Sequence, residues 1–229
     1  MTEAFGVSRE NMLSSGFWPE KGASMRGFRN PLDFLRFAKF VQKTGEFRPR
    51  FGEGGAELDP NFQQLIMYAV IINNKGDLLL YERAREGHGE KRLAGRASIG
   101  IGGHMERGDK NIIRSLYREL AEEIGIWEDG REVDTAKTKR GMKDFARVSV
   151  IGIIKDDKSE AGEDHFGVLC FVAPKKEGIE LKVRTGKESK TSKYVGDNEF
   201  LRLANSRIIN PEPWTAKVFA SISSVGVKG

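Results

Sequence analysis

The sequence predicts an α/β fold in which a mixed β-sheet is covered by helices. Short apolar runs typical of strands recur along the chain, and only a few segments space their apolar residues as a helix does. The two kinds of segment are interspersed, as in layered α/β domains. A chain of 229 residues buries a sizeable core unaided, and the single Cys170 excludes an internal disulfide or a multi-cysteine zinc site.

Composition limits the partners of this chain. The formal net charge of +5 favours anionic ligands but does not reach the charge density of a nucleic-acid-binding protein. The longest apolar run, at 65–72, holds eight residues and is too short to span a bilayer. The first 25 residues lack the apolar core of a signal peptide. We therefore expect a cytoplasmic protein that binds neither membranes nor nucleic acid, and a homodimer is left open.

Residues 1–62 form an aromatic-rich, basic segment. Asn30 and Pro31 favour the start of a helix, and apolar residues then recur at helical spacing as far as Gly45. This pattern predicts one helix over 31–43. We interpret the segment as an N-terminal helical extension packed on a main domain of residues 63–229.

The main domain begins with a strand–turn–strand pattern at 65–83, in which Asn73 to Gly76 form the turn. A glycine-rich, basic loop follows, and a short strand then runs into Gly102 and Gly103. The remaining elements expected are strands at 146–154, 166–173 and 179–184, an acidic loop at 155–164, and a last helix beginning at Pro211 or Pro213.

One predicted helix, at 111–124, carries a cluster of carboxylates, and Gly125 stands where a C-terminal cap is expected. With about 100° per residue, its apolar residues share one side. Glu119, Glu122 and Glu123 share the neighbouring side. So many like charges destabilise a helix surface unless something neutralises them.

A divalent cation would remove this repulsion, and carboxylate oxygens suit Mg²⁺ or Mn²⁺ better than Zn²⁺. From the three glutamates alone, the alternative is a solvated helix face, because glutamate is a good helix former. The flanking residues favour the metal site. A strand that ends at Gly102 and Gly103 lets backbone atoms approach a ligand closely.

This order of strand, Gly-Gly loop and carboxylate helix resembles the Nudix box. In that signature a glycine, five residues, a glutamate and seven residues precede the run R-E-U-x-E-E-x-G-U, where U is a bulky apolar residue. Eight of the nine fixed positions match here. They are Gly103, Arg118, Glu119, Leu120, Glu122, Glu123, Gly125 and Ile126.

Two departures from the box lie in the loop before the helix. Asp109 stands where a glutamate is expected, and eight residues rather than seven separate it from Arg118. The sequence therefore leaves open whether Asp109 or Glu106 serves as the upstream acid. The stretches 46–71, 92–104 and 164–172 also resemble a group of bacterial Nudix proteins.

The resemblance implies a Nudix-type α/β/α sandwich and a hydrolase that cleaves a diphosphate linking a nucleoside to another group. By the same resemblance, Glu122 and Glu123 are metal ligands, and Glu119 completes the metal site or acts as the general base. The Gly102 carbonyl is implied as a further ligand. Arg118 is expected to orient a carboxylate, with Glu122, four residues on, as its candidate. The implied cofactor is Mg²⁺, with Mn²⁺ as the alternative, and the partner is a small diphosphate substrate.

The general base has other candidates in the acidic loop, namely Glu160, Glu163 and Asp164. Arg83 and Arg92 flank the glycine-rich loop and, with Gly103, are candidates for substrate binding. The alternative for the two arginines is a solvated basic surface.

Two rival functions differ in class from a hydrolase. A non-catalytic Nudix domain could sense a ligand or bind RNA, but such domains often lack box glutamates, and all three are present here. An isomerase on the same scaffold would need an accessible catalytic cysteine. Cys170, in the middle of a predicted strand, is poorly placed for that role.

Overall fold

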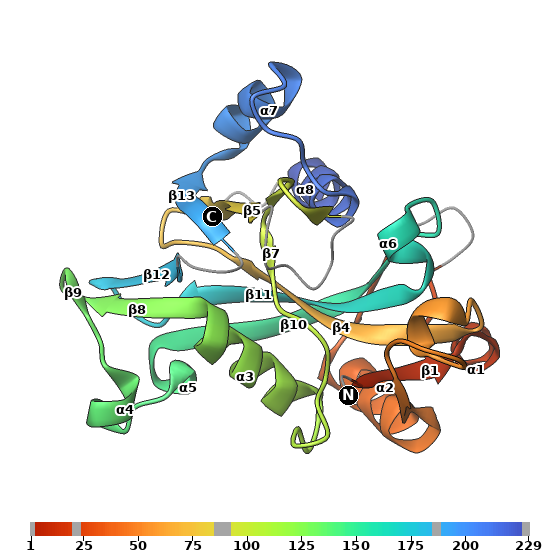
Figure 1. The fold of residues 1–229 in the computed structure, drawn as a ribbon. Helices are drawn as coiled ribbons and strands as arrows, with labels where there is room; N and C mark the ends of the chain where they lie inside the picture. Colours follow the sequence, from red (N-terminus) through yellow and green to blue (C-terminus); the bar gives the residue numbers. More distant parts are fainter. Residues whose placement is uncertain (1–2, 20–23, 85–92, 185–188, 226–229) are drawn as a thin grey trace. The chain divides into compact units, whose positions relative to one another are not determined.

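The computed structural model describes residues 3–19, 24–84, 93–184 and 189–225, and it contains both helices and strands throughout (Figure 1). The helical elements are α1 Arg9–Ser14, α2 Pro31–Thr44, the 3₁₀ turn η1 Ala56–Leu58, α3 Ile112–Glu123, α4 Thr135–Thr138, α5 Met142–Phe145, α6 Glu160–Glu163, α7 Asp197–Asn205 and α8 Pro213–Val225. The strands are β1 Glu3–Ser8, β2 Met25–Gly27, β3 Glu46–Pro49, β4 Phe62–Ile71, β5 Leu78–Arg83, β6 Ala97–Ser98, β7 Gly100–Ile101, β8 Ile124–Glu128, β9 Arg131–Glu132, β10 Ala146–Lys155, β11 His165–Pro174, β12 Ile179–Val183 and β13 Ser189–Val195. No helix in the described ranges is long and apolar enough to cross a membrane.

The chain divides into two compact units. Unit 1 comprises Met1–Tyr68, Gly102–Glu119 and Val150–Cys170. Unit 2 comprises the remainder, Ala69–Ile101, Leu120–Ser149 and Phe171–Gly229. The division falls within α3 and within the three long strands β4, β10 and β11.

The N-terminal segment supplies strands to the sheet of unit 1, which the sequence did not predict. β1 pairs antiparallel with β3 on one side and with β4 on the other, in registers that include Phe5 with Phe47 and Val7 with Gln63. β2 pairs antiparallel with β10. The order of the strands is β2-β10-β11-β4-β1-β3. β1, β2 and β3 are therefore strands of the same sheet as β4, β10 and β11.

β4 and β11 run parallel, which makes the sheet mixed as predicted. The N–H of Gln64 bonds the carbonyl of Asp164, and the N–H of Ile72 bonds the carbonyl of Val172. From the first pair to the second, the residue numbers rise by the same amount on both strands, which happens only when the strands are parallel.

Helix α2 confirms the helix predicted over 31–43. The side chain of Asn30 accepts a hydrogen bond from the N–H of Asp33 at 3.1 Å and so caps the first turn, with Pro31 at its first position. Phe37 is fully buried and meets the ring of Phe166 edge-on at 6.5 Å. The helix thus buries its aromatic side against β11.

In unit 2, the predicted turn between β4 and β5 is confirmed. Gly76 has a φ of 85°, and the side-chain oxygen of Asn73 accepts the N–H groups of Lys75 and Asp77. β5 lies between β13 and β6, and β8 lies between β12 and β9. The last helix, α8, begins at Pro213, which is one of the two residues at which the sequence predicted its start.

The end of α3 corrects one expectation about Gly125. This residue does not close the helix in the left-handed conformation, because β8 begins at Ile124 and continues through it. The carbonyl of Glu123 is satisfied by the N–H of Arg184 instead, at 2.7 Å. A Cβ on Gly125 would lie 2.6 Å from the ring of Trp127. Glycine is therefore needed here for the packing of Trp127.

Candidate active site

Helix α3 presents the predicted apolar face and the predicted glutamates. Leu116 and Leu120 are fully buried. Glu119 is also buried, with 7% of its surface exposed, whereas Glu123 is half-buried and Glu122 is exposed. A carboxylate as buried as Glu119 requires specific partners to stay charged.

Gly102 and Gly103 are both required as glycines, and for different reasons. Gly102 has a φ of 139°, and a Cβ there would lie 2.2 Å from the carbonyl oxygen of Met67. A Cβ on Gly103 would lie 2.9 Å from Oε2 and 3.0 Å from Oε1 of Glu119. The carbonyl of Gly103 accepts the N–H of Met67 at 2.9 Å. β4 therefore fixes the loop, and the absent side chain leaves room for the Glu119 carboxylate.

Arg118 links this carboxylate to the loop. Its Nη1 donates to Glu119 Oε1 at 2.8 Å, and its Nη2 donates to Asp109 Oδ2 at 2.8 Å and to the His104 carbonyl at 2.9 Å. Nε lies 3.2 Å from both Asp109 oxygens. Charge-assisted bonds from one planar guanidinium hold both carboxylates. The predicted role of Arg118 in orienting a carboxylate therefore has a structural basis in Asp109 and Glu119, while its pairing with Glu122 remains a prediction.

Asp109 and Glu106, the two alternatives for the upstream acid, differ in their environment. The side chain of Asp109 is 6% exposed and that of Glu106 is 67% exposed, with its nearest oxygen 3.7 Å from Arg118 Nη1. Burial raises the pKa of Asp109, but hydrogen bonds from Arg118 and from the Glu106 N–H outweigh burial and hold that pKa below its ordinary value. Asp109 is therefore an ionised partner of Arg118.

A second polar cluster in unit 1 was not predicted from the sequence. Glu57, Asp164 and His165 place one potential ligand atom each within 4.8 Å of one another. His165 Nδ1 lies 2.7 Å from Asp164 Oδ1, and Arg50 Nε donates to Glu57 Oε1 at 2.7 Å. Such a set could hold a cation, although Arg50 already neutralises one of its carboxylates. No sequence signal pointed to Glu57, because it lies in the N-terminal segment far from the box.

His104 lies beside this cluster, and its imidazole ring carries no charge near pH 7. Its Nε2 lies 3.0 Å from Gln64 Oε1, and its ring meets that of His165 at 5.4 Å. Burial, with the nearby His165 and Arg50, lowers the pKa of His104 well below its ordinary value. His104 is therefore neutral near pH 7.

The candidates for the general base differ in accessibility. Asp164 is buried against His165, and Glu163 is exposed. The side chain of Glu160 lies outside the described part of the structure.

Of the two arginines predicted to bind substrate, Arg83 can be placed. Its Nε donates to Oε2 of Glu212 at 2.8 Å, and Glu212 is 2% exposed. Ser98 donates to the other oxygen of Glu212 at 2.7 Å. Arg83 thus takes part in a buried network at the start of α8, and its role in substrate binding stays a prediction. Arg92 lies outside the described residues.

Cys170 is fully buried, and burial raises the pKa of its thiol to about 12. The thiolate needed for nucleophilic or acid–base work is therefore absent near neutral pH. This environment disfavours the isomerase alternative.

Comparison with known proteins gives consistent matches. The sequence profile of the NUDIX domain matches residues 63–196. Protein YmaB of Bacillus subtilis (strain 168) is 33% identical over 161 residues, covering 66% of this chain and 70% of that protein. Among solved structures, Tm1382, a candidate Nudix hydrolase, aligns with a TM-score of 0.69 at 20% identity, over 98% of this chain and 100% of that one. This likeness confirms the predicted α/β/α sandwich fold.

Proposed function

Because the chain belongs to the Nudix family, we propose that it is a magnesium-dependent pyrophosphohydrolase whose substrate is a nucleoside diphosphate derivative or a related small organic pyrophosphate. As a Nudix hydrolase it acts on phosphorus-containing anhydrides. The observation that supports the proposal most directly is the Glu119 carboxylate, which is buried on α3, oriented by Arg118 and accommodated by Gly103.

The donor atoms suit a hard divalent cation. We assign Glu122 and Glu123, in the last turn of α3, as carboxylate ligands of Mg²⁺ or Mn²⁺, together with Glu119 and the carbonyl of Gly102. All four donors are oxygens, which these cations prefer, and the chain offers no second cysteine for a softer metal. A bound cation would neutralise the diphosphate and lower the pKa of a bound water.

The protein's own contribution is positioning. Arg118 Nη1 donates to Oε1 of Glu119 at 2.8 Å and so holds that carboxylate with a charge-assisted bond. Asp109 fixes the guanidinium from the other side. This arrangement limits the rotation of the Glu119 carboxylate, as catalysis with oriented groups requires.

The identity of the general base is open between Glu119 and the acidic-loop residues Glu160, Glu163 and Asp164. Four single variants, Glu119→Gln, Glu160→Gln, Glu163→Gln and Asp164→Asn, distinguish the candidates. The variant that removes the base should lose the acidic limb of the pH profile of kcat as well as rate, whereas a variant that only weakens metal binding should recover rate at high Mg²⁺.

The proposal is tested by a hydrolysis screen. Nucleotide sugars, dinucleoside polyphosphates, ADP-ribose and nucleoside triphosphates are incubated with Mg²⁺, and phosphate release is measured after phosphatase treatment. We expect turnover of at least one class, and a loss of about two orders of magnitude in kcat for Glu123→Gln. Glu177→Gln, at an exposed glutamate outside α3, is the matched control. Ligand binding without any turnover would instead support the non-catalytic alternative.

Location and assembly are also proposals. We place the enzyme in the cytoplasm, acting on a small molecule rather than on nucleic acid. A homodimer is tested by light scattering of the full chain.

A further inference from the structure

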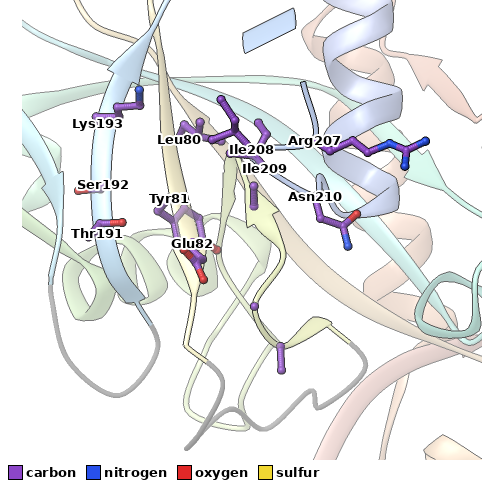
Figure 2. Close-up of a pocket in the computed structure, with 13 residues that line it drawn as sticks. Leu80, Tyr81, Glu82, Thr191, Ser192, Lys193, Arg207, Ile208, Ile209 and Asn210 are labelled. Carbon is purple, nitrogen blue, oxygen red and sulfur yellow. The ribbon is translucent and has the colours of Figure 1, made fainter. Parts of the chain in front are cut away.

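One face of the three-stranded sheet β13-β5-β6 lines a cavity of about 910 Å³ in unit 2 (Figure 2). Residues two apart on a strand share a face, so Leu80 and Glu82 of β5 point the same way. Ala97 of β6 pairs with Glu82 and lies on that face as well. All three residues line the cavity. The register of the sheet therefore brings one carboxylate and two apolar side chains to the same wall.

The segment between α7 and α8 forms a second wall of the cavity. Its apolar part is Ile208, which is 63% exposed, and the neighbouring Ile209. Two backbone bonds of 2.9 Å tie this segment to β6, from the Ala97 N–H to the Asn210 carbonyl and from the Glu212 N–H to the Ala97 carbonyl. The strand that pairs with Glu82 therefore also holds the apolar wall in place.

Glu82 is the charged residue of the lining whose charge nothing offsets. Lys193 also lines the cavity, but its Nζ is paired with Glu199 Oε1 at 2.6 Å. The side chain of Arg207 extends away from Glu82, beyond Ile208 (Figure 2). Glu82 is half-buried, and its carboxylate makes no hydrogen bond or ion pair within the described ranges. The lining therefore presents one uncompensated negative charge to a ligand.

This carboxylate restricts the kind of ligand that the cavity accepts. An ionised carboxylate only accepts hydrogen bonds, and its burial is unfavourable without donors or an opposite charge. An anionic ligand would be repelled. A hard metal ion requires several oxygen ligands with negative charge, and Glu82 is the only acidic residue among the described residues that line the cavity. A protonated amine supplies both the N–H donors and the opposite charge in one group.

We propose that this cavity binds a small organic cation, in which a primary ammonium pairs with Glu82 and an aliphatic chain packs against Leu80 and Ile208. The Thr191 hydroxyl and the Asn210 amide also line the cavity, and they add hydrogen-bond acceptors without adding charge. The volume falls in the range of about 300–1,000 Å³ that is typical of small-ligand sites. The ammonium belongs either to a free alkylamine or to a lysine side chain of a peptide. This inference does not rest on the proposed function.

The test compares three probes of the same chain length that differ in charge, namely pentylammonium, 1-pentanol and pentanoate. Each is titrated near neutral pH, where a primary amine is protonated, into the full chain labelled with ¹⁵N. Binding is followed by the amide shifts of β5 and β13. We expect pentylammonium to bind about tenfold or more tightly than 1-pentanol, because only the ammonium pairs with the Glu82 charge. Pentanoate should bind more weakly than either. Nα-acetyl-lysine amide serves as a fourth probe, and tighter binding of it than of pentylammonium identifies a peptide lysine as the source.

Three variants assign the binding to particular side chains. Glu82→Gln should abolish the preference for pentylammonium over 1-pentanol, and it should fold, because Glu82 loses no partner within the described ranges. The matched control Glu177→Gln, at an exposed glutamate outside the cavity lining, should keep the preference. Ile208→Ser should weaken pentylammonium and 1-pentanol alike, because both probes lose the same apolar contact.

Equal binding of pentylammonium and 1-pentanol would overturn the inference, as would tighter binding of pentanoate, no binding of any amine, or an unchanged preference in Glu82→Gln. If Glu82→Gln does not fold, the comparison of the probes in the wild type decides alone. The outcome is separate from that of the proposed function. Hydrolysis of a diphosphate without amine binding rejects only the cation site, and amine binding without hydrolysis rejects only the enzyme.

Discussion

Replacing Asp109 by Asn tests the arrangement that holds Glu119. In the structure, Asp109 accepts three contacts from Arg118, at 2.8–3.2 Å, and one from the Glu106 N–H at 2.9 Å. An asparagine is nearly the same size, but its NH₂ group would face the donors of the guanidinium. The variant therefore removes the negative charge and places an N–H donor of asparagine against the N–H donors of Arg118.

The expected cost follows from the partners that Arg118 keeps. Breaking a buried charge pair costs about 3–5 kcal/mol when the remaining charge is left uncompensated. Arg118 retains Glu119 and the His104 carbonyl, so we expect about 2 kcal/mol, or about 4–8 °C in Tm for a chain of this size. The freed guanidinium also lets the Glu119 carboxylate move. A misplacement of about 1 Å can cost about 100-fold in rate, so kcat should fall between about 10- and 100-fold.

The assay is thermal unfolding together with kcat on the substrate found in the screen. The control is Glu106→Gln, because its exposed carboxylate should contribute less than about 0.5 kcal/mol. Sequence spacing alone, with its extra residue before Arg118, predicts a small effect of Asp109→Asn, under about tenfold in kcat. If Asp109→Asn resembles Glu106→Gln in both measurements, the coupling of Asp109 to Glu119 through Arg118 is wrong.

Four further predictions address other parts of the molecule. Mg²⁺ or Mn²⁺ should raise Tm through binding to the folded state, and Glu122→Gln should remove most of that rise; an equal rise in both proteins contradicts the metal site. Gly103→Ala should lower kcat about 10- to 100-fold by displacing Glu119, whereas Gly108→Ala, where a Cβ meets nothing within 4 Å, should be nearly neutral in the same assay. The buried thiol of Cys170 should react with a disulfide reagent only after unfolding, and rapid labelling of the native protein at pH 7 would refute its burial. Folding lowers the pKa of Asp109 below its ordinary 3.8, so the ionised Asp109 should contribute its full stabilisation above pH 3.8. This stabilisation should be lost as the pH falls through the lowered pKa. In that acidic range the stabilities of wild type and Asp109→Asn, measured by acid unfolding, should converge.

The elements that the sequence predicted correctly are those with local causes. Helix α2 follows from an asparagine cap, a proline and helical spacing, and the turn at Asn73 follows from its side chain and from Gly76. The face of Leu116 and Leu120 on α3 also follows from spacing alone. Such signals lie within a few residues and need no partner strand.

The features that were missed or misplaced depend on distant partners. β1 and β3 are recognisable as strands only through their pairing with each other and with β4. Gly125 was interpreted as a helix cap, but its small size serves Trp127 in the next strand. The contacts of Asp109 depend on how the box loop folds back on Arg118, which the count of spacer residues does not determine.

The N-terminal segment supports the candidate site through the backbone of β4. β1 pairs with Phe62–Gln64 at the start of β4, and further along the same strand the N–H of Met67 holds the carbonyl of Gly103. Gly103 in turn leaves the space that the Glu119 carboxylate occupies. Arg107 of the box loop pairs directly with Glu3 of β1. Both links lead to β1, one through β4 and one directly, so the first strand of the chain supports the loop that carries Gly103. The division into an extension of residues 1–62 and a main domain stays a prediction.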